Sequence, residues 1–192
     1  MRLILASQSP RRKELLSSLG YEYEVCPADT DETVDEDIDS IYVPELLARK
    51  KAETVLGENP GAVVIGSDTV VICGGKILGK PHSREEAKAM LTLLSGKKHT
   101  VATGLCVCSD EKTRSLVSVT DVYFYELSEK LIDSYIATGE PMDKAGAYGI
   151  QGIGSALVRK IDGDYFTVMG LPLSQTARLL SQFGIFGKFL KF

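Results

Sequence analysis

Hydrophobic positions along this chain follow two spacings. Short apolar or alternating runs are typical of β-strands, and apolar residues every three or four positions are typical of amphipathic helices. The strands expected from the first spacing are Leu3–Ala6, Tyr21–Cys26, Ala62–Ile65, Val70–Cys73, Lys76–Leu78, His99–Cys108, Leu116–Tyr125, Ala156–Ile161 and Tyr165–Met169. The helices expected from the second are Pro10–Leu19, Val43–Leu56 and residues 83–94, 128–138 and 172–183. The intermixed order predicts an α/β protein with a mixed central sheet flanked by helices.

Turn-forming residues mark the boundaries between these elements. Ser83 is followed three residues later by Glu86, the pattern of a capping box at a helix start. The stretch Gly66-Ser67-Asp68-Thr69 is polar and begins with glycine, so it predicts a loop between two strands. Asp162-Gly163-Asp164 predicts the turn of a hairpin between the last two strands.

The first expected helix has an unusual distribution of charge. Ser9 suits the N-cap and Pro10 the first helical position, but Arg11, Arg12 and Lys13 then fill the first turn. Because the helix dipole already places positive charge there, each cation costs a few tenths to about 1 kcal/mol. Serine hydroxyls, free backbone N–H groups and arginines at a helix start form a phosphate site. The alternative is an ordinary surface helix whose long cations turn into water.

Composition narrows the classes of protein to consider. A chain of 192 residues with 44% hydrophobic and 25% charged residues is typical of one globular domain. The net charge of −4 argues against nucleic-acid binding, which needs a basic face. There is no membrane-length apolar run and no signal-peptide pattern. Four cysteines without metal-ligand spacing fit a reducing compartment, so we expect a cytoplasmic protein without a nucleic-acid or membrane partner.

Carboxylates and lysines follow several of the expected strands. Asp68 lies at a strand end, where ligands gather in α/β sheets; it could bind a divalent cation, accept a proton from water, or cap its own turn. Glu32 follows another strand and could face the same place. Lys51 and Lys80 are either phosphate ligands or ordinary surface lysines. Together these groups describe a metal–triphosphate site, whereas the acids from Asp35 to Asp39 are interpreted as a solvated face.

A glycine-rich segment spans residues 139–154. Its glycines permit a close approach of the backbone to a ligand, although a long connector would look similar. Gln151 within this segment can donate and accept hydrogen bonds at once, which suits recognition of the edge of a nucleobase.

Taken together, these motifs resemble the Maf family over nearly the whole chain, in the family's order and spacing. The resemblance is carried by Ser7-Gln8-Ser9-Pro10-Arg11-Arg12-Lys13-Glu14-Leu15-Leu16, Asp31-Glu32, Lys51-Ala52, Gly66-Ser67-Asp68-Thr69-Val70-Val71, Gly79-Lys80-Pro81, Asp143-Lys144-Ala145-Gly146-Ala147-Tyr148-Gly149-Ile150-Gln151-Gly152 and Gly170-Leu171-Pro172.

The resemblance implies a nucleoside triphosphate pyrophosphatase, a hydrolase of acid anhydrides that releases pyrophosphate and leaves a monophosphate. It also implies one Maf-type domain over residues 1–192, bilobed with a deep cleft and similar to the inosine triphosphatase (Ham1-like) fold. A divalent metal cation (Mg²⁺ or Mn²⁺), a cytoplasmic location and a homodimer are expected from the same resemblance. Some members were first named for arresting septum formation.

Three positions separate the branches of the family. The branch acting on dTTP and UTP resembles this chain in having Arg11, Thr69 and Gln151. The branch acting on 7-methyl-GTP has an aromatic residue, a glutamine and a glutamate there. The chain therefore looks like a dTTP/UTP pyrophosphatase. It departs from the family at Leu46, where an arginine is often found, which puts a phosphate contact from that helical turn in doubt.

The resemblance also implies a role for each candidate. Asp68 would accept the proton of the attacking water, and Glu32 with Asp68 would hold the metal. The triphosphate would be bound by Ser7, Ser9, Arg12, Lys51 and Lys80, and the pyrimidine would be read by Arg11, Thr69 and Gln151. Two alternatives stay open: a nucleotide-binding inhibitor of septum formation that acts without catalysis, and the same chemistry on other or modified nucleotides. Intact Glu32, Asp68 and Lys80 favour an enzyme.

Overall fold

The computed structural model describes residues 1–34 and 37–188, and within it the chain divides into two compact units. Unit 1 comprises Met1–Asp68, Thr103–Ser118 and Gly170–Phe192. Unit 2 comprises Thr69–Ala102 and Val119–Met169. Part of the acidic stretch expected to be a solvated face, residues 35–36, lies outside the described residues.

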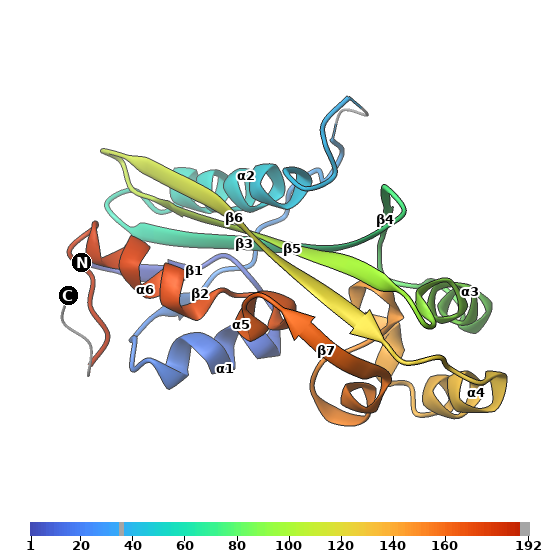
Figure 1. The fold of residues 1–192 in the computed structure, drawn as a ribbon. Helices are drawn as coiled ribbons and strands as arrows, with labels where there is room; N and C mark the ends of the chain where they lie inside the picture. Colours follow the sequence, from blue (N-terminus) through green and yellow to red (C-terminus); the bar gives the residue numbers. More distant parts are fainter. Residues whose placement is uncertain (35–36, 189–192) are drawn as a thin grey trace. The chain divides into compact units, whose positions relative to one another are not determined.

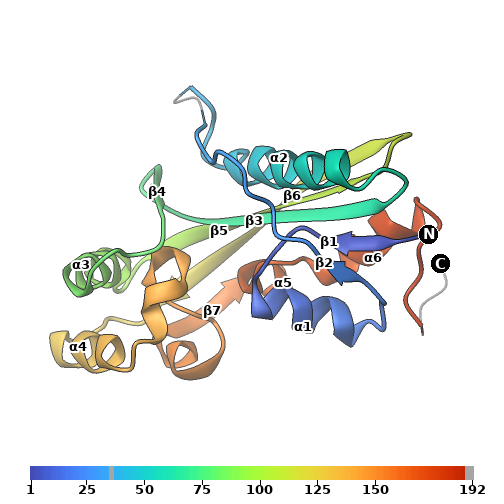
Figure 2. The same ribbon diagram turned by 180° about the vertical axis from the view of Figure 1, so that it is seen from behind.

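Unit 1 is a sheet with helices on both faces. Its strands are ordered β2-β1-β3-β5-β6, and β1 pairs in parallel with both β2 and β3. In both views α2 lies on one side of β3, and α1 and α6 lie on the other (Figures 1 and 2). The elements are β1 (Leu3–Leu5), α1 (Pro10–Ser18), β2 (Glu24–Val25), α2 (Val43–Glu58), α6 (Leu173–Ser181) and parts of β3 (Val63–Cys73), β5 (Lys98–Cys108) and β6 (Thr113–Phe124).

Small side chains let α2 lie very close to the sheet of unit 1. Ala48 and Ala52 of α2 are fully buried against apolar residues of β1, β3 and β5. A Cβ on Gly66 of β3 would fall 2.1 Å from the Ala48 carbonyl oxygen, and one on Gly104 of β5 would fall 2.0 Å from the Pro44 carbonyl oxygen. Both positions therefore need glycine because the helix backbone occupies the space of a side chain.

Unit 2 contains the remaining parts of β3, β5 and β6 with a second set of helices. β4 pairs antiparallel with β3, and β7 pairs antiparallel with β6. Helices α3 and α4 lie side by side (Figures 1 and 2), where Lys88 of α3 contacts Glu129 and Asp133 of α4 at 2.7 and 2.9 Å. The additional elements are β4 (Lys76–Leu78), α3 (Arg84–Leu94), α4 (Glu129–Ala137), β7 (Val158–Asp162), α5 (Tyr165–Met169) and the 3₁₀ helices η1 (Glu140–Asp143), η2 (Ala145–Ala147) and η3 (Gly152–Leu157).

Most expected elements are confirmed, including the mixed sheet flanked by helices and the cap of α3, in which the Ser83 hydroxyl accepts from the Glu86 backbone N–H. The Glu86 carboxylate accepts from the His82 backbone N–H at 2.7 Å, one residue before the N-cap position that a capping box uses. Two local predictions are wrong. The expected loop Gly66–Thr69 lies within one continuous strand, β3. The expected hairpin strand at residues 165–169 is the helix α5.

A side-chain cap explains the second error. The Asp164 carboxylate accepts hydrogen bonds from the Thr167 backbone N–H (2.7 Å) and hydroxyl (2.8 Å), which fixes a helical turn there. This cap overrides the strand preference of the aromatic and β-branched residues that follow. Among the described residues, no helix is long and apolar enough to cross a membrane.

Candidate active site

The turn between β1 and α1 has the capped helix start that the sequence predicted. The Ser9 hydroxyl accepts from the Arg12 backbone N–H at 3.5 Å, and Pro10 begins the helix. The Ser7 hydroxyl accepts from the Ser9 backbone N–H and from Arg12 Nη1, both at 3.2 Å. Ser7, Ser9 and Arg12 therefore form one cluster at the positive end of the α1 dipole. This arrangement suits binding of an anion.

The Arg12 guanidinium is fixed by hydrogen bonds to two separate acceptors. Its Nε donates to the Gly170 carbonyl oxygen at 2.8 Å, while Nη1 faces the Ser7 hydroxyl. Burial lowers the pKa of Arg12, the nearby Asp68 carboxylate opposes that shift, and Arg11 adds to it. Because arginine stays charged in proteins, Arg12 is a fixed, partly desolvated cation near the Asp68 carboxylate.

Alternation along β3 places Asp68 on the α2 face of the sheet. Side chains two residues apart on a strand share a face, so Asp68 follows Gly66, against which α2 packs. Ser67 points the opposite way, is fully buried, and lies within hydrogen-bond distance of the Gly104 (2.9 Å) and Gly170 (3.0 Å) carbonyl oxygens. Asp68 is thus fixed by a strand and a packed helix rather than by the turn that its sequence suggested.

Two carboxylates meet one ammonium at this position. Lys51 Nζ of α2 lies 2.6 Å from Asp68 Oδ1 and 2.8 Å from Glu32 Oε1. The side chains of Lys51 and Asp68 are 14% and 15% exposed, whereas Glu32 is 62% exposed. Low exposure strengthens the Lys51–Asp68 pair relative to a surface ion pair.

The carboxylate pair fits a divalent cation with a substrate phosphate as a further ligand. Asp68 and Glu32 already reach one cationic atom, Lys51 Nζ, and Mg²⁺ is usually held by one or two carboxylates plus substrate oxygens and water. Within residues 1–34 and 37–188, no group of three or more His, Cys, Asp or Glu side chains is arranged to hold a metal.

The remaining predicted residues fall into both units. Arg11 lies in α1 of unit 1 and is partly buried. Thr69, Lys80 and Gln151 belong to unit 2. Within unit 2, the Gly146 backbone N–H donates to the Gly79 carbonyl oxygen at 3.0 Å. This bond ties the loop carrying the exposed Lys80 to the glycine-rich segment that carries Gln151.

Some supporting residues were missed by the sequence interpretation. Gly170, at φ 105°, accepts a hydrogen bond from Arg12 through its carbonyl oxygen. The sequence interpretation noted Gly170-Leu171-Pro172 as a motif but gave this glycine no role. Ser67 was interpreted as part of a polar loop, although its place between apolar runs also fits a buried hydroxyl. Glu140, which lies inside the glycine-rich segment, and Tyr135 accept hydrogen bonds from the backbone of residues 149–154, and the sequence interpretation gave neither residue a role.

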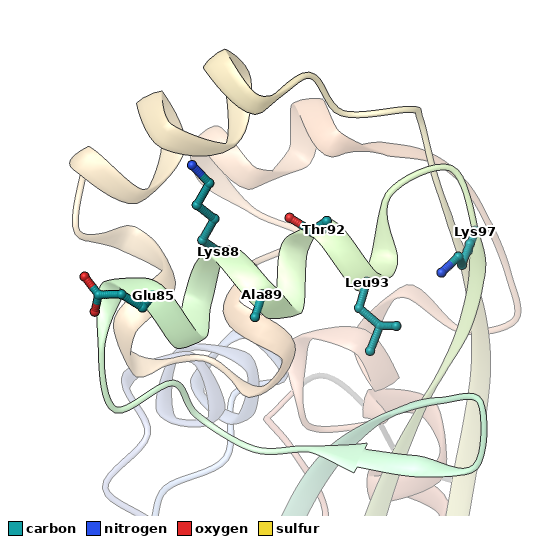
Figure 3. A pocket seen from close by; sticks show the side chains of 6 residues that line it. All are labelled: Glu85, Lys88, Ala89, Thr92, Leu93 and Lys97. Carbon is teal, nitrogen blue, oxygen red and sulfur yellow. The ribbon is translucent and has the colours of Figure 1, made fainter.

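A hollow on the surface of α3 does not contain any of the predicted site residues. It is lined by Glu85, Lys88, Ala89, Thr92, Leu93 and Lys97, all in unit 2 (Figure 3). Because none of its lining groups has been assigned a role with nucleotide or metal, it has no part in the proposed chemistry.

Comparison with known proteins identifies the family. Residues 2–183 match the family model described as Maf, Maf-like protein. The dTTP/UTP pyrophosphatase of Bacillus pumilus (strain SAFR-032) is 50% identical over 183 residues, covering 95% of this chain and 97% of the relative. That of Bacillus velezensis (strain DSM 23117 / BGSC 10A6 / LMG 26770 / FZB42) is 51% identical over 184 residues, covering 96% and 97%.

Solved structures support the fold. A HAM1 protein from Coxiella burnetii matches with a TM-score of 0.51 at 14% identity, covering 95% of this chain and 99% of that one. The Staphylococcus aureus Ham1 protein matches with a TM-score of 0.50 at 14% identity, covering 82% and 80%. At this identity the likeness shows the fold alone, and the Ham1-like prediction is confirmed. The family model over residues 2–183 and the close relatives lead to one conclusion: the chain belongs to the Maf family.

Proposed function

We propose that this protein hydrolyses dTTP and UTP to the monophosphate and pyrophosphate. The proposal rests mainly on the carboxylate pair Asp68 and Glu32 around Lys51, with Arg12 nearby. Hydrolysis of a phosphoanhydride needs carboxylates to hold a metal ion and accept a proton, and cations to stabilise the negative charge that develops. Curated relatives that are 50% and 51% identical over nearly the whole chain are named dTTP/UTP pyrophosphatases, which supports the same substrates here.

In the proposed reaction, Asp68 accepts a proton from a water molecule. The water oxygen forms a bond to the α-phosphorus, the bond from that phosphorus to the bridging oxygen breaks, and pyrophosphate leaves with the electron pair. Lys51 contacts Asp68 at 2.6 Å before substrate arrives. An incoming triphosphate competes with Asp68 for the Lys51 ammonium. When Lys51 pairs with the phosphate instead, the Asp68 carboxylate is free to act as the base.

The cations and hydroxyls of the site would bind the triphosphate. Ser7, Ser9 and Arg12 offer hydroxyl and guanidinium donors at the start of α1. Lys51 and Lys80 would neutralise the negative charge that develops on the leaving pyrophosphate. Arginine suits the first role because its fixed, planar donors match phosphate oxygens.

A divalent cation, Mg²⁺ or Mn²⁺, would be held by Glu32 and Asp68. Such a cation polarises phosphoryl oxygens and neutralises the leaving group. Removal of divalent metal with EDTA should abolish turnover, and addition of Mg²⁺ or Mn²⁺ should restore it. Turnover that persists in excess EDTA would contradict this role for the carboxylate pair.

Base selection would depend on Arg11, Thr69 and Gln151. A glutamine amide can donate to and accept from the edge of uracil or thymine. Cytosine presents a donor where uracil presents an acceptor, so a buried polar group would be left unpaired. We therefore expect UTP and dTTP to be preferred over CTP, and replacement of Gln151 by glutamate should weaken that preference.

The direct test is a panel of nucleoside triphosphates with Mg²⁺ or Mn²⁺ in which pyrophosphate and phosphate release are measured separately. The proposal predicts pyrophosphate from UTP and dTTP, and little turnover by the Asp68→Asn variant although nucleotide still binds. Release of phosphate alone would exclude a pyrophosphatase. Binding without turnover would favour a non-catalytic role, such as inhibition of septum formation.

Two further expectations accompany this function. An enzyme of the nucleotide pool would act in the cytoplasm, and the family resemblance favours a homodimer. Sedimentation equilibrium would distinguish a dimer from a monomer of 20.8 kDa.

A further inference from the structure

The part of the glycine-rich segment that carries Gln151, residues 149–154, is held on both sides of Gln151 by one carboxylate and one phenol. Glu140 Oε1 accepts from the Gly154 backbone N–H at 2.9 Å, and Oε2 accepts from the Ile153 backbone N–H at 3.0 Å. Tyr135 donates its hydroxyl proton to Glu140 Oε1 at 2.9 Å, and the Tyr135 hydroxyl oxygen accepts from the Gly149 backbone N–H at 3.2 Å. All of these groups lie in unit 2.

Close packing leaves this segment little room to move. A Cβ on Gly152 would fall 2.8 Å from Glu140 Oε2. A Cβ on Gly154 would fall 2.4 Å from the Gly149 carbonyl oxygen and 2.5 Å from the Tyr135 hydroxyl. The glycines therefore let the backbone lie directly on the Tyr135–Glu140 pair, which fixes the course of the chain on both sides of Gln151.

The electrostatics of the pair suit a permanent anchor. Burial raises the pKa of Glu140, but the backbone N–H groups of Gly154 and Ile153 and the Tyr135 hydroxyl outweigh this, so the net shift is downward. Burial is the main cause that raises the pKa of Tyr135, which is 1% exposed. Around neutral pH the carboxylate is thus an ionised acceptor and the phenol a protonated donor. Hydrogen bonds to an ionised acceptor are stronger than those between neutral groups.

The start of η1, where Glu140 lies, is held in place by Lys144. Lys144 Nζ donates to the Glu140 backbone oxygen and to Asp143 Oδ1, both at 2.6 Å. The Lys144 side chain also lies against Gly149, where a Cβ would fall 2.9 Å from its Cε. Lys144 thus contacts both Glu140 and Gly149, and so gives a second link between Glu140 and residues 149–154.

We propose that Glu140 and Tyr135 are positioning residues that hold Gln151 in the orientation needed to select the pyrimidine base. This inference rests on the proposed function, because it takes Gln151 as the residue that reads the base. A recognition group must be held within a fraction of an ångström to discriminate between similar ligands. The Tyr135–Glu140 pair supplies that constraint through its hydrogen bonds to the backbone N–H groups of Gly149, Ile153 and Gly154.

The test compares UTP with CTP, which differ at the edge of the base. In Glu140→Gln, one carboxylate oxygen becomes an NH₂ group that cannot accept from the backbone; in Tyr135→Phe, the bridging hydroxyl is lost. Each variant should lower the ratio of kcat/KM for UTP over CTP about tenfold, through a higher KM for UTP and with kcat changed less than about threefold. The matched controls Glu129→Gln, a surface carboxylate paired with Lys88, and Tyr125→Phe, an exposed tyrosine, should keep the ratio.

A double-mutant cycle separates positioning from a general loss of structure. If Glu140 acts through Gln151, the change Glu140→Gln should have no further effect on the UTP/CTP ratio in a Gln151→Ala background. Faster amide hydrogen exchange at Ile153 and Gly154 in Glu140→Gln, with exchange in α3 unchanged, would show that the anchor alone was lost. If Glu140→Gln does not fold, Tyr135→Phe carries the same comparison with faster exchange at Gly149.

The outcomes for the two proposals are distinguishable. A wild-type ratio in both Glu140→Gln and Tyr135→Phe, together with a lost preference in Gln151→Ala, would overturn the positioning role and leave the function intact. A wild-type protein that releases no pyrophosphate from any triphosphate would overturn the function first. Unchanged preference in Gln151→Ala would show that Gln151 does not read the base, and the positioning role would fall with it.

Discussion

Replacing Gly66 with alanine tests how the packing of α2 on β3 builds the active site. The new Cβ would fall 2.1 Å from the Ala48 carbonyl oxygen and 2.9 Å from the Ala52 Cβ. Ordinary contact begins at 3.4 Å, so the helix or the strand must move by 3.4 − 2.1, or about 1.3 Å. Because the obstacle is backbone, no rotamer change can relieve it.

Two losses follow from this displacement. Overpacking of this kind costs about 1–3 kcal/mol of the free energy of unfolding. For a chain of this size that corresponds to a Tm lower by about 2–12 °C. The same shift separates Lys51 from Asp68, now 2.6 Å apart, and a misplacement of about 1 Å can cost on the order of 100-fold in turnover.

The measurements are urea unfolding and kcat/KM for UTP. Gly57→Ala is the matched control, because Gly57 lies in the same helix and a Cβ there meets nothing within 4 Å. It should leave activity unchanged and raise stability by up to about 1 kcal/mol, as alanine is the better helix former. A Gly66→Ala protein as stable and as active as Gly57→Ala would refute the close-packing argument.

Two further predictions concern charge. His99 is 2% exposed and burial lowers its pKa from 6.5 to about 4, so the unfolded chain binds a proton at this histidine before the folded chain does as the pH falls. The free energy of unfolding should therefore drop by about 3 kcal/mol between pH 6.5 and 4. Urea unfolding at pH 7, 5.5 and 4 measures this drop, and the His99→Phe variant should lack it. Arg12→Lys keeps the positive charge, but a single ammonium cannot replace both the hydrogen bond from Nε to the Gly170 carbonyl and that from Nη1 to the Ser7 hydroxyl. The kcat/KM for UTP should fall about 10- to 100-fold. A wild-type kcat/KM would show that these two fixed donors do not matter.

The sequence predicted the outline of the fold because most elements carry local signals. Gly74 (φ 58°) and Gly75 (φ 77°) form the turn between β3 and β4, in the left-handed conformation that glycine adopts readily in such hairpins. Ser128 caps α4 by accepting from the Leu131 backbone N–H, and Gly139, at φ 77°, follows its end. These features depend on residues a few positions apart, which a single sequence displays directly.

The errors came from residues whose partners are distant in sequence. Gly66 was interpreted as a turn residue, whereas its role is to admit Ala48 of α2. Ser67 was assigned to a loop, whereas it is buried beside carbonyl oxygens 37 and 103 residues away. Composition and spacing cannot reveal such contacts, because the same glycine and serine occur in turns and in close-packed strands.

For the site, sequence reasoning supplied the residue types and the structure supplied part of their grouping. The structure brings together six predicted residues within unit 1, by direct contacts or by the charges that act on Arg12: Ser7, Ser9, Arg12, Glu32, Lys51 and Asp68. The deep cleft, the roles of Arg11, Thr69 and Gln151 in base selection, and the contribution of Lys80 stay predictions. Substrate panels with the wild-type protein and its variants can test these roles.

The central claim is that Asp68 activates a water molecule for attack on the α-phosphorus. Hydrolysis of UTP in ¹⁸O-labelled water, with mass spectrometry of both products, tests it most directly. We expect the label to enter UMP and not pyrophosphate, and we expect Asp68→Asn to form little labelled UMP. Label found in pyrophosphate would place the attack on the β-phosphorus, and label found in inorganic phosphate would place it on the γ-phosphorus; either result would contradict the mechanism.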